Sequence, residues 1–292
     1  MWTMILAGAM LAAAPAQQQM DTTVAVDPKA RLRMENVRGD VVIHTWDKPQ
    51  LRVHSSDSDE DFRLRVAAGA SSVTVGLEPM GGHVGRPPSA DLELTIPATM
   101  GIALTGSDGD VKIEGAAGEV SVETVHGDVV VSGGAGLVQL QSVQGDITLS
   151  GATARVEIHA VNGDIHLHGI TGDVVAETMS GDVSLDGIDA RTVQISAVSG
   201  DLSCDGTVKE GGHYSLKTHS GDVTFGMPQG AGATIDVSTF TGDFQADIPV
   251  QLTEQSKSRH FSFTLGSGGA RVELESFSGD IRLARSGFAG KR

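Results

Sequence analysis

The chain has 292 residues and a formal net charge of −16, and a surface this acidic repels nucleic acid and anionic membranes, which excludes both as partners. Its 38 Gly residues and many β-branched residues, without long helical patterns, predict an all-β protein with Gly-rich turns. The single cysteine, Cys204, excludes an intramolecular disulfide, so packing and hydrogen bonds must stabilise the fold.

Residues 1–16 are predicted to be a cleaved export signal. Residues 4–14 are apolar and uncharged, and Ala14-Pro15-Ala16 matches the small-x-small cleavage pattern, with the cut before Gln17. The alternative is an uncleaved anchor or a buried apolar segment, although this stretch is short for a transmembrane helix. We therefore expect an exported protein, periplasmic or at the cell surface or extracellular, with no membrane span after cleavage.

Residues 17–108 form a degenerate β-repeat region by the same pattern analysis. The segment 31–46 alternates apolar and polar residues, with Leu32 and Met34 predicted to face inward and Gly39-Asp40 in a turn. Further strands are expected at 62–66, 72–78 and 91–96, and loops at 55–62 and 80–89. No clean linker follows, so we expect one continuous body.

Residues 109–284 carry a regular repeat that begins with Gly-Asp. Val111 and Ile113 alternate with Lys112 and Glu114, and each repeat holds two such strands. Fixed-period repeats of this length predict stacked units. We predict a β-solenoid, similar to a parallel β-helix or β-roll, with coils of about 18 residues and two strands per coil; an antiparallel sandwich or meander is the alternative. Residues 285–292 are a C-terminal tail. The repeats start at Gly109, Gly127, Gly145, Gly163, Gly181, Gly200, Gly221, Gly242 and Gly279.

These motifs resemble those of the bacterial family DUF4097. The resemblance is carried by ENVRGDVVIHTW near the start, DLELTIPAT before the repeats, and the iterated TVxGDVxVxG pattern, and it covers roughly residues 30–284. The resemblance implies a β-strand repeat protein with an adhesin-like role at the bacterial cell envelope. It implies no catalytic residues.

The aspartates of the Gly-Asp turns are the main candidate site. Gly supplies a positive φ in the turn, and the Asp beside it can accept a backbone hydrogen bond. The functional alternative is cation binding, because carboxylates stacked about 5 Å apart repel one another and Ca²⁺ would relieve that repulsion. The seven candidates are Asp110, Asp128, Asp146, Asp164, Asp182, Asp201 and Asp222. No other cofactor is expected.

A column of bulky residues follows a small residue at the end of each second strand. We expect these bulky side chains to pack in the core or at a corner of the coil, and an exposed binding stripe is the alternative. The column comprises Val125, Val143, Val161, Met179, Val198, Phe240 and Phe277.

Two further residue types are candidates for metal chemistry. His166 and His168 share one face of a strand, and His159 lies on another strand; two such His can bind Zn²⁺ when further ligands are near, but we favour a solvated surface pair. Cys204 falls in an inward column and is expected to be a core residue.

No catalytic motif such as G-x-S-x-G, H-E-x-x-H or a P-loop is present in the sequence. We therefore predict a non-catalytic, exported binding or structural module that contacts an envelope or extracellular ligand, either protein or glycan. One alternative is a periplasmic scaffold or sensor component that docks a protein partner at an end of the stack. A carbohydrate-active β-helix enzyme is a further, less favoured alternative.

Overall fold

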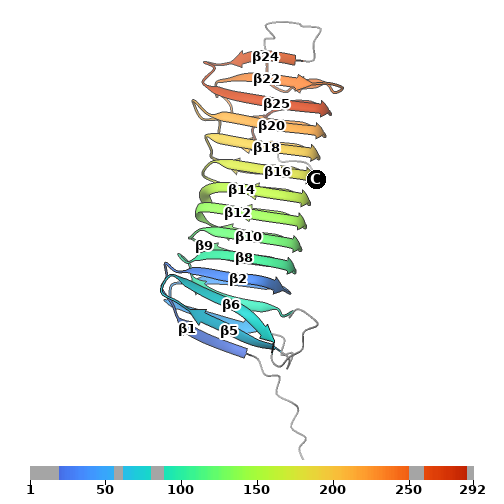
Figure 1. Ribbon diagram of the computed structural model, residues 1–292. Coiled ribbons are helices and arrows are strands. Elements are labelled where there is room, and N and C mark those ends of the chain that lie inside the picture. The colour runs from blue at the N-terminus through green and yellow to red at the C-terminus, as the bar shows by residue number, and fades with distance from the viewer. Residues whose placement is uncertain (1–19, 56–61, 80–88, 250–259, 288–292) are drawn as a thin grey trace, which may run out of the picture.

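The computed structural model describes residues 20–55, 62–79, 89–249 and 260–287 (Figure 1). The described chain contains 26 β-strands and no helix, and the strands form two sheets of 13 strands each, A and B. The all-β prediction is therefore confirmed. The predicted signal at 1–16 and most of the predicted loops at 55–62 and 80–89 lie outside the described residues.

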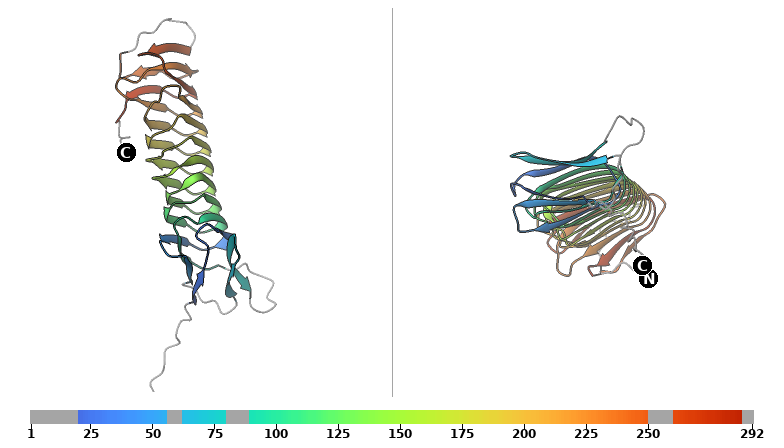
Figure 2. Two further views of the ribbon diagram at one scale, coloured as in Figure 1. Left: turned by 90° about the vertical axis from the view of Figure 1, so that its left-hand side faces the viewer. Right: turned by 90° about the horizontal axis from the view of Figure 1, so that it is seen from below.

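The two sheets face each other along a rod, with the strands lying across its long axis (Figures 1 and 2). Sheet A consists, in spatial order, of β1 (Met20–Ala25), β4 (Gln50–Ser55), β7 (Leu92–Pro97), β3 (Val41–Trp46), β9 (Val111–Ala116), β11 (Val129–Gly133), β13 (Ile147–Ser150), β15 (Ile165–His168), β17 (Val183–Ile188), β19 (Leu202–Gly206), β21 (Val223–Met227), β26 (Ile281–Arg285) and β23 (Phe244–Ala246). Sheet B consists of β24 (His260–Leu265), β22 (Ala233–Thr239), β25 (Ala270–Ser278), β20 (His213–Ser220), β18 (Thr192–Ser199), β16 (Val174–Ser180), β14 (Thr153–Asn162), β12 (Ala135–Gln144), β10 (Val120–His126), β8 (Gly101–Asp108), β2 (Arg31–Arg38), β6 (Ser72–Pro79) and β5 (Phe62–Ala68).

Neighbouring strands in the body of each sheet run parallel, and equivalent residues of successive repeats lie side by side. Val120 pairs with Val138, and Val138 in turn pairs with Val156. Among the described strands, antiparallel pairs occur only towards the ends of the sheets, in β1–β4, β4–β7, β5–β6 and β22–β24. The predicted stacking of like on like is confirmed, and the antiparallel sandwich is excluded.

The core lies between the two sheets. Alternate side chains of each strand point inward, and β-branched residues suit this pleated, buried surface. Leu32 and Met34 are buried as predicted, and Cys204 is buried among the inward residues of sheet A. Each fully buried Val, Leu or Ile side chain contributes about 1.5–3 kcal/mol relative to exposure. The sheet A column is Val41, Val111, Val129, Ile147, Ile165, Val183, Leu202, Val223 and Ile281, and each member is 3% exposed or less.

We define a rung as one sheet B strand, the Gly-Asp turn that follows it, and the next sheet A strand. Rungs mostly stack in chain order, but the order breaks at the C-terminal end. The last rung, β25–β26, lies between β20–β21 and β22–β23, because β25 pairs with both β20 and β22 and β26 pairs with both β21 and β23. The last two rungs therefore do not stack in the order in which their Gly-Asp motifs occur in the sequence.

Candidate functional site

The edge of the rod where sheet B turns into sheet A is built from the Gly-Asp pairs. Gly127 has a φ of +114°, a conformation that other residues resist. A Cβ at this position would lie 2.2 Å from the carbonyl oxygen of Gly109 in the preceding rung. Glycine is therefore required both by the backbone conformation and by the close approach of successive turns.

The aspartate of each turn connects its rung to the next. Its Oδ1 accepts a hydrogen bond from the backbone N–H of the equivalent aspartate one rung further along, at 2.7–2.9 Å. The acceptors, in order along the rod, are Asp91, Asp40, Asp110, Asp128, Asp146, Asp164, Asp182, Asp201, Asp222 and Asp280, and the last donor is the N–H of Asp243. We call these eleven residues the Asp column.

All seven candidate aspartates lie in this column, which extends further at both ends than the sequence prediction. Asp40, Asp243 and Asp280 each follow a glycine, so the same motif could have identified them. Asp91 follows Ala90 and carries no such signal. The donor is a backbone N–H of the neighbouring rung, where we had expected a donor within the same turn.

The Asp column is a line of negative charge. Within the described ranges, none of its members forms an ion pair with a Lys, Arg or His side chain. Strands are about 4.8 Å apart, so successive carboxylates repel one another. Calcium binding at this column remains a prediction. In the same part of the chain, no group of three or more His, Cys, Asp or Glu is arranged to hold a metal ion.

Two residues before each glycine, the bulky column runs along the same edge. The structure contradicts our expectation that these side chains pack in the core or at a corner, because all of them except the half-buried Val161 are exposed, while most of the small residues before them are buried. Thr124 is 5% exposed, whereas Val125 is 40% exposed. We call this column, with His219 added at the equivalent position of its rung, the apolar stripe: Val125, Val143, Val161, Met179, Val198, His219, Phe277 and Phe240.

The C-terminal part of the apolar stripe is aromatic. The rings of His219 and Phe277 stack with centroids 4.7 Å apart, and those of Phe277 and Phe240 stack at the same distance. His219 lies in β20, Phe277 in β25 and Phe240 directly after β22, so the broken order of the last rungs makes Phe277 the central ring of the ladder. The sequence prediction missed the ladder because it left His219 out of the column and expected the bulky side chains to pack in the core or at a corner.

The candidate histidines lie on outer faces and contact acidic neighbours. His168 Nδ1 lies 3.0 Å from Oδ2 of Asp186, and His159 Nδ1 lies 3.2 Å from Oε2 of Glu177. His166 pairs with Thr148 and Ser184 in the sheet. These contacts are those of exposed side chains on neighbouring strands.

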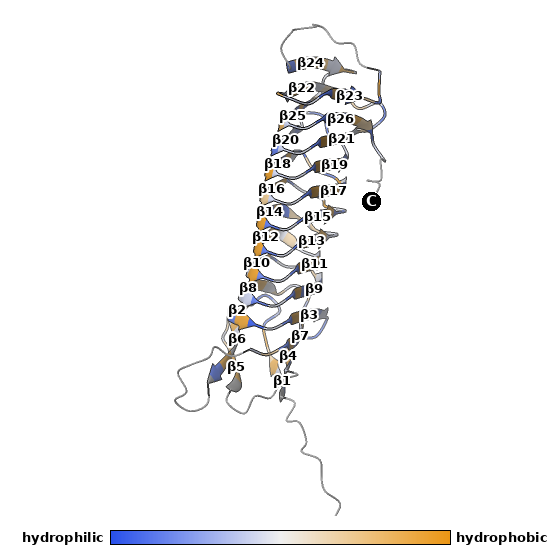
Figure 3. Cartoon of the chain, turned by 90° about the vertical axis from the view of Figure 1, so that its right-hand side faces the viewer, coloured by the Kyte–Doolittle hydropathy of each residue, from blue (hydrophilic) through white to orange (hydrophobic). Residues whose placement is uncertain are grey.

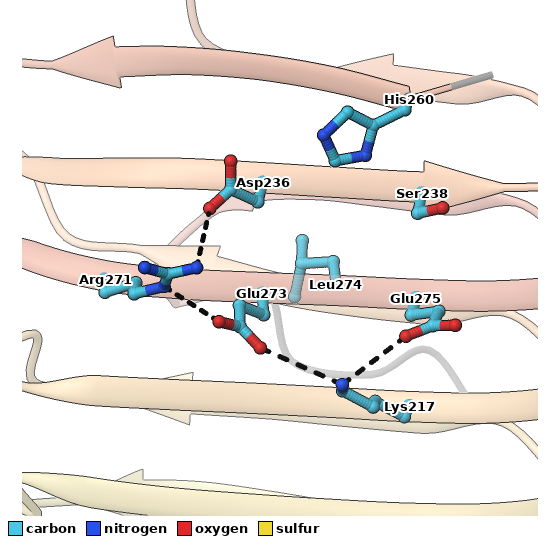
Figure 4. Close-up of a pocket in the computed structure, with 8 residues that line it drawn as sticks. All are labelled: Lys217, Asp236, Ser238, His260, Arg271, Glu273, Leu274 and Glu275. Atoms are coloured by element: carbon cyan, nitrogen blue, oxygen red, sulfur yellow. Dashed lines mark hydrogen bonds and ion pairs between the residues drawn. The ribbon is translucent and has the colours of Figure 1, made fainter. Parts of the chain in front are cut away.

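A shallow hollow of about 310 Å³ lies on the outer face of sheet B near its C-terminal end (Figure 4). Arg271 contacts Asp236 at 3.6 Å and Glu273 at 2.8 Å, and Lys217 contacts Glu273 at 3.8 Å and Glu275 at 3.5 Å. Lys217 and Arg271 are therefore both paired with carboxylates of the protein itself. Because the groups are exposed, such pairs contribute little to stability.

The arrangement defines an all-β protein of two large, mainly parallel sheets with a repeated acidic turn along one edge. The chain belongs to the DUF4097 family, because the family model described as Toastrack DUF4097 matches residues 31–284. The resemblance seen in the sequence is thus confirmed. A search of curated proteins found no match. No described helix is long and apolar enough to cross a membrane.

Ten chains among solved structures match. A candidate adhesin of Bacteroides fragilis shares 15% identity, with 92% of this chain and 98% of that chain covered and a TM-score of 0.45. A candidate lipid-binding protein of Parabacteroides distasonis shares 12% identity, with 91% and 97% covered and a TM-score of 0.41. A candidate adhesin of the same organism shares 11% identity, with the same coverage and a TM-score of 0.38.

Proposed function

We propose that this protein is an exported, non-catalytic β-solenoid, with coils of about 18 residues and two strands per coil, that acts as an adhesin-like binding or structural module at the bacterial cell envelope. Membership of the DUF4097 family supports the envelope role through the resemblance described above. The ligand class is a protein or a glycan.

The observation that carries the proposal is the repetition of outward-facing side chains along both sheets. On sheet B, Glu123 pairs with Gln141, which pairs with His159, which pairs with Glu177. Each rung thus presents a similar position at a regular spacing of about 4.8 Å. Such an array suits many weak contacts made together, whose combined affinity exceeds that of any one contact.

A second candidate is a periplasmic scaffold or sensor component that docks a protein partner at an end of the stack. Both sheets terminate in edge strands, and β23 has only three residues, Phe244–Ala246. An edge strand presents backbone groups that can pair with another chain. A cell-surface position would favour the adhesin-like role, and confinement to the periplasm would favour the scaffold.

The test combines localisation with binding. Protease accessibility on intact cells reports whether the protein reaches the surface. The purified protein is then screened against glycans, matrix proteins and envelope fractions, with and without Ca²⁺. A saturable ligand supports the binding role, and dependence on Ca²⁺ assigns a cation to the Asp column. No saturable ligand, or hydrolysis of a polysaccharide that stops on replacing one carboxylate, refutes the proposal.

A further inference from the structure

We propose that the apolar stripe and the adjacent Asp column together form a docking surface for a basic amphipathic α-helix of a protein partner. This inference rests on the proposed binding function and names the surface and the partner class. Its starting point is a row of side chains that are apolar except for His219 and exposed except for the half-buried Val161. Such a row marks an interaction site far more specifically than scattered apolar residues do.

Most members of the apolar stripe are substantially exposed. Val143 is 41% exposed, Met179 57%, Val198 51% and Phe277 47%. Viewed on this edge, the hydrophobic ends of the sheet B strands β10 to β18 follow one another along the rod, beside hydrophilic turns (Figure 3). Covering these side chains would remove apolar surface from water at about 25 cal/mol per Å².

The charge beside the apolar stripe selects the partner. In each rung the apolar residue is followed by a polar residue, a glycine and the aspartate, as in Val125 and Asp128, so the two columns run parallel along one edge. A partner with Lys or Arg flanking an apolar face would complement both. A second copy of this chain would bring two Asp columns together, and an anionic membrane would meet like charge.

The spacing of the rungs favours a helix as the occupant. The eight strands that carry the apolar stripe make it about 34 Å long at about 4.8 Å per strand. A helix of about 22 residues has this length, and its pitch of about 5.4 Å nearly matches one apolar contact per rung. An extended strand repeats a face only every 6.6 Å or so and matches less well. The helix would contribute apolar anchors spaced three and four residues apart, as amphipathic helices do when they bind other proteins.

The experiment measures binding of a synthetic 22-residue Leu/Lys amphipathic helix to the purified full chain by fluorescence anisotropy. A scrambled peptide of the same composition and a Leu/Glu helix are the control peptides. We expect the Leu/Lys helix to bind at least tenfold more tightly than either. Equal binding of the scrambled peptide would show that charge alone is recognised and would overturn the proposal.

Variants locate the site. Met179→Ser with Val198→Ser is expected to weaken binding at least tenfold, whereas Val130→Ser, at a 39% exposed apolar site on the outer face of sheet A, leaves it unchanged. Asp164→Asn with Asp182→Asn keeps an acceptor oxygen for the backbone hydrogen bonds and is expected to weaken binding and reduce its salt dependence. Unchanged affinity in the apolar variants overturns the proposal, and circular dichroism verifies that each variant is folded.

Two further measurements assign the surface to one occupant. If phosphatidylglycerol vesicles bind and the apolar variants lose this binding, the surface binds lipid. If the protein self-associates and the apolar variants do not, the surface binds a second copy of the chain. Either result overturns the proposal. Failure of the docking surface and failure of the proposed function give different results. If the screen finds a ligand that binds all variants equally, only the docking surface is refuted. If the screen finds no ligand but the helix binds and this binding is lost in the apolar variants, only the adhesin-like role is refuted.

Discussion

Substitution of a turn glycine tests the stacking of the rungs directly. Gly127→Ala would force a φ of +114° on a residue with a side chain and place its Cβ 2.2 Å from the Gly109 carbonyl oxygen. The conformation costs about 1–3 kcal/mol, and relieving the overlap costs about as much again. We expect the free energy of unfolding to fall by about 4 kcal/mol.

Gly151→Ala is the matched control. Gly151 also has a positive φ, +66°, but a Cβ there would meet no atom within 4 Å. Only the left-handed conformation is penalised, at about 1–2 kcal/mol. Urea unfolding followed by far-ultraviolet circular dichroism measures both variants. Equal losses of stability would refute the claim that successive turns are in backbone contact.

Three further predictions concern single side chains. Ser142→Ala should raise stability by about 1 kcal/mol, because the buried Ser142 hydroxyl has no hydrogen-bond partner among the described residues; a lower melting temperature would contradict this. Burial raises the pKa of the Cys204 thiol to about 12, so Ellman's reagent at pH 8 should label it only in denaturant, and rapid labelling of the folded protein would argue against burial. Hydrogen bonds from Gln139 and Arg155 lower the pKa of Glu157, so its contribution is present above its unfolded pKa of about 4.3 and is lost as pH falls through the lower folded pKa. Melting temperatures of Glu157→Gln should therefore fall less than those of the wild type between pH 5 and 3, and parallel pH profiles would contradict this.

Strand alternation was the most reliable guide to this fold. Inward columns such as Val111, Val129 and Ile147 follow from a period of two, because one face of each strand must be buried. The same rule applies to the strand ends, where Val120 and Val122 face inward and Thr124 follows them. Val125 must then face outward, and our expectation of a packed corner gave its apolar character more weight than its position.

The order of the last rungs could not be predicted from the repeat. Every Gly-Asp turn offers the same donor and acceptor, so the local pattern does not specify which rung lies beside which. The hollow around Lys217 and the stacking of Phe277 on His219 both depend on that order. These parts of the site therefore required the three-dimensional arrangement.

The inserted last rung has a consequence for synthesis on the ribosome. The parallel partner of β22 is β25 and that of β23 is β26, so residues 233–246 have no place in the stack until residues 270–285 have been made. Growth of the rod from its N-terminal end can therefore proceed rung by rung only through β21. The final two rungs must then join the stack together, because β25 and β26, which are made last, provide the pairing edge for β22 and β23, which are made before them.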